Sequence, residues 1–240
     1  GLARCSGILA FADLLVHGDF GLGACHAVDG EMMVKEGTPY RFLPSGVTEV
    51  ADPRIRVPFA LVTHFRPQLG LTTHQKFPSL ELETFLSSQL PDQNRSYSIR
   101  IKGTFNTLWV RTALKQAMPY VLPALHTKEF HRQNISGTMF GYRFPDSSLE
   151  TTGAGYHFHF VADDKNLGGH VLGFELSAGA HIEIQELVRE EVYADTGNEI
   201  EAEEIELPVE GVVEVASGMP IIAANTLLAN PVNPLIGVLK

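Results

Sequence analysis

The pattern of apolar and polar residues predicts many short strands and few helices. Alternating or continuous apolar runs typical of strands lie at 24–34, 38–43, 57–65, 96–105, 107–114, 137–144, 155–162, 170–176 and 180–187. Helical spacing occurs at 8–17, ended by Gly18, and from Ser79, the expected N-cap, to about Leu90. Because strands and helices do not alternate as in a parallel sheet, the pattern predicts an α+β fold. We expect it to be mostly β, with two mixed or antiparallel sheet lobes.

A proline-containing segment divides the predicted strands into two groups. Residues 116–126 contain Pro119 and Pro123 and are interpreted as a connector. The expected organisation is an N-terminal β-rich lobe, 1–121, and a C-terminal β-rich lobe, 122–240, packed as one compact unit.

The charge distribution excludes one class of partner. The chain of 240 residues has a formal net charge of −10, and residues 183–214 hold 12 of its 28 acidic residues with Arg189 as their only base. Because nucleic-acid binding requires a basic face, no nucleic-acid partner is expected.

The sequence contains no run of 18 apolar residues, so no membrane span is expected. The chain begins at Gly1, so a removed targeting segment stays possible and the location, cytoplasmic or secreted, is left open.

The two cysteines, Cys5 and Cys25, do not form a disulfide framework. Two buried thiols are favoured over a single bridge between them.

The most informative segment alternates aromatic residues with histidines, at 155–161. Side chains on a strand point to opposite faces with a period of two, so Tyr156, Phe158 and Phe160 are expected to face the core. His157 and His159 then lie side by side on the other face, where two imidazoles can bind one metal ion. Such a pair is a weak signal alone, since histidines also occur as satisfied polar groups on a sheet.

A third histidine strengthens the prediction. Residues 163–169 are turn-formers, and His170 opens the next apolar run. A hairpin would return His170 to the pair, and three histidines with open positions are typical of a catalytic metal site.

Several separated motifs resemble the alpha-acetolactate decarboxylase family, in order from about residue 8 to about residue 187. They are LLVHGDFGLG at 14–23 with DGE at 29–31, PFALVT at 58–63, IRIKGTF at 99–105, Arg111-Thr112, and GYHFH at 155–159 with GGH at 168–170. The resemblance implies a homodimeric enzyme that converts the small molecule 2-acetolactate to (R)-acetoin and CO2. It implies Zn²⁺, or another divalent transition metal, on His157, His159 and His170, with Glu31 and Arg111 beside it.

The chain departs from the family in two places. Ala24 stands where the family often has threonine, so one polar contact is expected to be missing. The family also uses a glutamate from its C-terminal tail, and here Glu204 and Glu206 are the first candidates. Glu203, Glu210 and Glu214 stay open.

Loss of CO2 from a 2-hydroxy-3-keto acid leaves electrons that the neighbouring ketone can accept, and a divalent cation would stabilise that charge. Arg111 can hold the carboxylate with two parallel hydrogen bonds, and Glu31 can serve as the acid–base group. Arg100 is a rival for the carboxylate contact. The alternatives are another three-histidine lyase or hydrolase acting on a small keto acid, or a non-catalytic metal-binding β-module.

Overall fold

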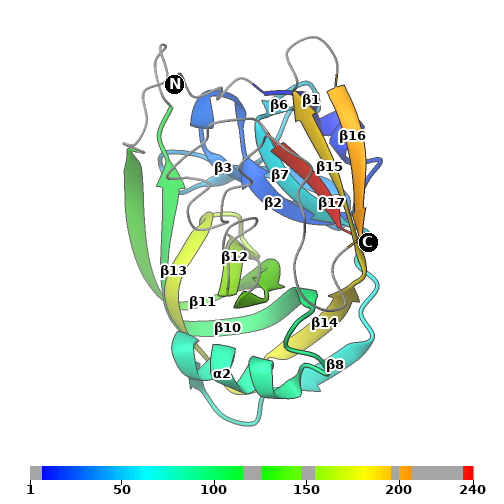
Figure 1. The fold of residues 1–240 in the computed structure, drawn as a ribbon. Coiled ribbons are helices and arrows are strands. Elements are labelled where there is room, and N and C mark those ends of the chain that lie inside the picture. The colour runs from blue at the N-terminus through cyan, green and yellow to red at the C-terminus, as the bar shows by residue number, and fades with distance from the viewer. Residues whose placement is uncertain (1–6, 116–125, 147–154, 196–199, 207–234, 240) are drawn as a thin grey trace.

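The computed structural model describes residues 7–115, 126–146, 155–195, 200–206 and 235–239, and beyond residue 188 the backbone alone (Figure 1). These residues form many strands and few helices, which confirms the predicted mostly-β, α+β class. The helical segments are α1 (Phe11–Leu14), the 3-10 turn η1 (His26–Val28) and α2 (Ser79–Gln89). No described helix is long and apolar enough to cross a membrane.

Two large sheets and one two-stranded sheet account for the described strands. The eight-stranded sheet has the order β16 (Ile200–Glu206), β15 (Arg189–Asp195), β17 (Leu235–Leu239), β7 (Phe59–Thr63), β2 (Phe20–Ala24), β3 (Glu31–Lys35), β4 (Thr38–Phe42) and β5 (Thr48–Val50). The seven-stranded sheet has the order β8 (Leu69–Thr72), β14 (His181–Leu187), β10 (Ser96–Ala113), β11 (Thr127–Phe144), β12 (Gly155–Ala162), β13 (Gly168–Leu176) and β9 (Phe77–Pro78). β1 (Leu9–Ala10) pairs with β6 (Arg56–Val57).

The sheets take strands from both sides of the connector. β10 pairs with β11 across residues 116–125, which lie outside the described residues, and β7 pairs in parallel with β17. The hydrogen-bonded sheets therefore do not follow the boundary at residue 121. The division into lobes 1–121 and 122–240 stays a prediction about domain organisation.

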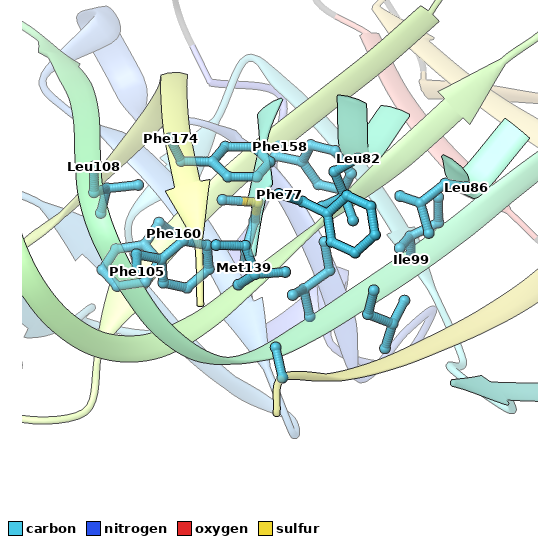
Figure 2. Close-up of a cluster of buried hydrophobic side chains, with 14 of the residues drawn as sticks. Phe77, Leu82, Leu86, Ile99, Phe105, Leu108, Met139, Phe158, Phe160 and Phe174 are labelled. Atoms are coloured by element: carbon cyan, nitrogen blue, oxygen red, sulfur yellow. The ribbon is translucent and has the colours of Figure 1, made fainter. Parts of the chain in front are cut away.

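Three apolar clusters give the molecule its layers. One packs α1 against the outer face of the eight-stranded sheet, and a second lies between the two large sheets. The third packs α2 against the far face of the seven-stranded sheet, where Phe105 meets Phe160 edge-on at 5.2 Å between ring centroids (Figure 2). Leu82, Leu86 and Leu90 of the α2 segment belong to this third cluster, as the helical spacing predicted.

The seven-stranded sheet closes on itself. β10 pairs with β11, β11 with β12, β12 with β13, and β13 again with β10. This closure is possible because β10 is long and strongly bent, so that its second half lies against β13 (Figure 1). The closed ring brings β10 and β11 beside the histidine hairpin formed by β12 and β13.

Several predicted element boundaries were wrong for identifiable reasons. The run 24–34 is two strands separated by η1, and 8–17 is helical only over Phe11–Leu14. The runs 96–105 and 107–114 are one strand, because backbone pairing with β11 continues past Asn106. Residues 127–136 extend β11 although they are mostly polar and exposed, since hydrogen bonds to β10 define them. Ser79 is the first residue of α2, and the N-cap Pro78 offers no side-chain hydrogen bond.

The turn between β3 and β4 provides a stability prediction. Glu36 and Gly37 both have positive φ, 51° and 74°, and form the two-residue loop between the paired Lys35 and Thr38. No atom lies within 4 Å of a Cβ built on Gly37. Gly37→Ala should therefore lower the free energy of unfolding by about 1–2 kcal/mol, through the left-handed backbone alone.

Denaturant titration would measure this loss against Gly70→Ala as the matched control. Gly70 lies in β8 without positive φ, and its nearest neighbour to an added Cβ is His181 Cε1 at 3.8 Å. The control should be neutral or slightly stabilising. Equal losses in both variants would contradict the conformational explanation.

Candidate metal centre

His157 and His159 lie on the face of β12 that turns toward the eight-stranded sheet. Phe158 and Phe160, which alternate with them, pack into the cluster under α2, as predicted. The histidine face is not exposed, however, because the second large sheet covers it: His157 and His159 are 2% and 1% exposed. Their rings stand 5.3 Å apart between centroids.

The predicted hairpin brings His170 to this pair. His170 is the direct cross-strand neighbour of His159 in the β12–β13 ladder. It is 5% exposed, and its Nδ1 lies 3.0 Å from Nε2 of His157. One ligand atom from each of the three histidines fits within a mutual distance of 4.8 Å, so the group could hold a metal ion.

Two observations favour the fit of a cation to these side chains. Nitrogens bound to one tetrahedral zinc ion stand about 3.3 Å apart, close to the His157–His170 separation. Nδ1 of His159 bonds to the Met32 carbonyl at 2.8 Å, which leaves its Nε2 buried and without a partner. A backbone carbonyl on the far nitrogen is the usual arrangement of a metal-binding histidine, since it orients the ring and fixes the tautomer.

Burial keeps the three imidazoles neutral. It lowers the pKa of His159 to about 4 and the pKa of His157 and His170 well below the ordinary value. The neighbouring histidines and the Arg111 charge lower the pKa of His157 and His170 further. Neutral imidazole is the form that binds a metal ion.

Glu31, predicted from the DGE motif, is the first residue of β3 and is fully buried beside the histidines. Its Oε2 accepts a hydrogen bond from the His170 backbone N–H at 3.2 Å, whereas its Oε1 has no partner. Burial raises the pKa of Glu31 to about 8, against the opposing effects of the Arg111 charge and the His170 N–H. Ala24 lies directly opposite Glu31 in the β2–β3 ladder, and its methyl group offers that carboxyl no hydrogen bond.

Arg111 is the cross-strand neighbour of His170 in the β10–β13 ladder. Its side chain is half-buried, its Nε is buried without a partner, and no described carboxylate forms an ion pair with it. Its charge nevertheless influences the pKa of Glu31 and of all three histidines. The site thus joins β3, β10, β12 and β13.

The rival arginine lies elsewhere. Arg100 forms an ion pair with Glu183 and stands over the rings of Phe20 and Phe65, 5.1 and 5.2 Å from their centroids.

The tail glutamates and one cysteine cannot be placed in the site. Glu203, Glu204 and Glu206 belong to β16, whose side chains are not described, and Glu210 and Glu214 lie outside the described residues. Cys25 is a buried free thiol, with its pKa raised to about 12 by burial, and Cys5 lies outside the described residues.

Two contacts of the site had no signal in the sequence. The Met32 carbonyl that orients His159 is a backbone group, so side-chain identity does not reveal it. Phe42 packs its ring 5.8 Å from that of His159, whereas the sequence pattern predicts Phe42 only as part of the strand 38–43. The alternation of Glu31 with Met33, which faces the cluster between the sheets, is the pattern from which an inward-facing Glu31 could have been argued.

Comparison with known proteins identifies one family. The family model described as alpha-acetolactate decarboxylase matches residues 3–206. The chain is 34% identical over 176 residues to the alpha-acetolactate decarboxylase of Methanosarcina mazei, covering 72% of this chain and 61% of that protein. It is 35% identical over 176 residues to that of Klebsiella aerogenes, covering 72% and 68%.

A solved structure shows the same fold. The crystal structure of alpha-acetolactate decarboxylase from Bacillus subtilis strain 168 superposes with a TM-score of 0.73 at 29% identity, covering 77% of this chain and 80% of that chain. With this likeness in fold and the family match over most of its length, the chain belongs to the alpha-acetolactate decarboxylase family.

Proposed function

We propose that this chain decarboxylates 2-acetolactate to (R)-acetoin and CO2 with a divalent ion, zinc foremost, held by His157, His159 and His170. The observation that carries the proposal is the convergence of three buried neutral histidines with Glu31 and Arg111, from four strands of two sheets. A buried carboxyl with an unbonded oxygen, Glu31, and a guanidinium with an unbonded Nε, Arg111, lie beside the ligands. Neither group is required for metal binding alone, so their presence favours a catalytic site.

The histidines supply three neutral ligands, so a bound ion would keep its full charge. Such an ion would supply Lewis-acid stabilisation of the negative charge that develops on the remaining fragment when CO2 leaves. The Met32 carbonyl holds the His159 ring in orientation, and the apolar residues around the three rings restrict access of water.

Arg111 is suited to bind the substrate carboxylate. Its planar guanidinium can donate two parallel hydrogen bonds and so give the substrate one orientation. Its position opposite His170, at the edge of the histidine group, supports this role.

Glu31 is suited to deliver the proton that replaces CO2. Its Oε2 is fixed by the His170 N–H, whereas Oε1 is unbonded and able to carry a proton. Delivery from one fixed carboxyl would reach one face of the enediolate and thereby set the handedness of the product.

An assay of acetoin from racemic 2-acetolactate tests the proposal directly. The zinc-loaded protein should form (R)-acetoin, and removal of the metal by a chelator should stop it until zinc is returned. Failure to form acetoin at full metal occupancy would refute the proposal and favour a hydrolase or a binding module.

Arg111→Lys tests the carboxylate contact. Lysine keeps the charge but loses the planar fork, so the loss of one charged contact, about 1.5–3 kcal/mol, should reduce kcat/KM roughly tenfold to a hundredfold, mainly through KM. Arg100→Lys is the matched control, because Arg100 pairs with Glu183 away from the histidines, and it should leave KM unchanged. If Arg100→Lys alone raised KM, the carboxylate contact would belong to Arg100.

Three further properties are proposed on the family resemblance and the composition. The chain forms a homodimer, takes no nucleic acid as partner, and contributes a tail glutamate, Glu204 or Glu206 first, to its site. Sedimentation measurements and single Glu→Gln substitutions in the tail test the first and last of these.

A further inference from the structure

Trp109, the only tryptophan of the chain, lies two residues before Arg111 on the same face of β10. Its ring stacks on His131 of β11, with centroids 5.0 Å apart and 21° between the planes. On its other side stands Gly173 of β13, where an added Cβ would lie 3.8 Å from Trp109 Cε3. The indole is therefore fixed between two neighbouring strands although it is 39% exposed.

The indole N–H holds one particular carboxylate. Nε1 of Trp109 donates to Oε2 of Glu129 at 3.1 Å. Glu129 is the direct cross-strand neighbour of Arg111 in the β10–β11 ladder. Cβ atoms of such neighbours are about 4.5–5.5 Å apart, so opposite charges at these positions ordinarily attract one another.

The expected ion pair is nevertheless missing among the described residues. No carboxylate of a described side chain lies within salt-bridge distance of Arg111, and its Nε is buried without a partner. The carboxylate directly opposite Arg111 on the neighbouring strand is engaged by Trp109 instead. A guanidinium kept unpaired in this way stays available to a carboxylate from outside the chain.

We propose that Trp109 is a positioning residue that holds Glu129 away from Arg111 and so keeps Arg111 free for the substrate carboxylate. This inference rests on the proposed function, in which Arg111 makes that contact. Without the indole N–H, Glu129 can turn to Arg111 and compete with the substrate. Exposed ion pairs contribute up to about 1 kcal/mol, which corresponds to roughly a fivefold weakening of carboxylate binding.

The test is calorimetric titration of the zinc-loaded protein with 2-hydroxyisobutyrate, a carboxylate with a 2-hydroxyl but no ketone, so that it cannot react as the substrate does. Trp109→Phe keeps an aromatic ring for stacking on His131 but lacks the donor. It should weaken binding about twofold to fivefold and raise KM for 2-acetolactate equally, with kcat retained. Adding Glu129→Gln should restore both values, and Glu129→Gln alone should bind the probe no more weakly than the parent.

Salt supplies a second readout. The defect of Trp109→Phe should shrink between about 0.05 and 0.5 M salt relative to the parent, since an exposed ion pair is screened, whereas a packing defect is not. A crystal structure of Trp109→Phe should show Glu129 paired with Arg111. Parental affinity in Trp109→Phe, or a defect that Glu129→Gln leaves unchanged, would overturn the inference.

The outcomes also separate this inference from the proposed function. If Arg111→Lys binds 2-hydroxyisobutyrate as tightly as the parent, the carboxylate contact itself is wrong. If Arg111→Lys binds weakly while Trp109→Phe binds normally, only the role of Trp109 is wrong.

Because Trp109 is partly exposed, the fold should tolerate Trp109→Phe. Glu129→Lys offers an independent variant that leaves the indole in place. It removes the competing carboxylate, so adding Trp109→Phe to it should cost no further affinity.

Discussion

Replacement of His157 by alanine is expected to remove both the metal and the activity. The three histidines provide the whole candidate ligand set of the described residues, and His157 faces His170 at 3.0 Å. Loss of groups that only orient a ligand costs about 10- to 100-fold in metal affinity, so loss of a ligand should exceed that range. Metal analysis of the purified variant and the acetoin assay measure the two effects together.

The matched control is His181→Ala. His181 lies exposed on β14, outside the candidate metal group, and its loss should leave about one metal ion per chain and full turnover. Full metal occupancy in a His157→Ala/His159→Ala variant that retains its circular dichroism spectrum would show that the ion is bound elsewhere.

Replacement of Glu31 by glutamine should cut turnover strongly while zinc is retained. Glutamine keeps the size of the side chain and can still accept the His170 N–H bond, but it cannot transfer a carboxylic proton. Loss of a general acid–base group typically costs 10²–10⁴-fold in rate, so we expect kcat to fall in about that range with a much smaller change in KM. Protonation by unguided water should also give acetoin of mixed handedness.

Chiral chromatography of the acetoin formed by Glu31→Gln, together with the zinc content of this variant, tests the prediction. Glu83→Gln is a suitable control, because Glu83 is a partly buried glutamate of α2 with its pKa raised by burial, on the far side of the seven-stranded sheet. Normal turnover with unchanged stereochemistry in Glu31→Gln would transfer the role of proton donor to another group, with a tail glutamate as the next candidate.

The local parts of the site followed from the sequence because their geometry is local. The period of two along a strand placed Phe158 and Phe160 in one core and His157 and His159 on the other face. The turn-forming residues 163–169 predicted the hairpin that pairs His159 with His170. The family motifs singled out Glu31 and Arg111, but they did not show how these residues reach the histidines.

The boundaries that failed were those set by partners distant in sequence. Residues 127–136 carry no apolar periodicity, yet they form a strand because their backbone groups pair with β10. The single strand Ser96–Ala113 likewise depends on its two ladders rather than on its side chains. Backbone hydrogen bonds are nearly independent of side-chain identity, so a pattern of residues does not report them.

By itself, the sequence determined the mostly-β class, the two-faced histidine strand and its hairpin, since each depends on neighbours within a few residues along the chain. Only the tertiary structure decided that this histidine face is buried, because a second sheet covers it. The structure also decided that β10 bends back onto β13 and sets Arg111 beside His170, and that Glu31 and the Met32 carbonyl of β3 reach the ring from the other sheet. These contacts join residues more than 50 positions apart. They are stabilised by the burial of the whole apolar core between the sheets, which no local segment of the sequence can provide.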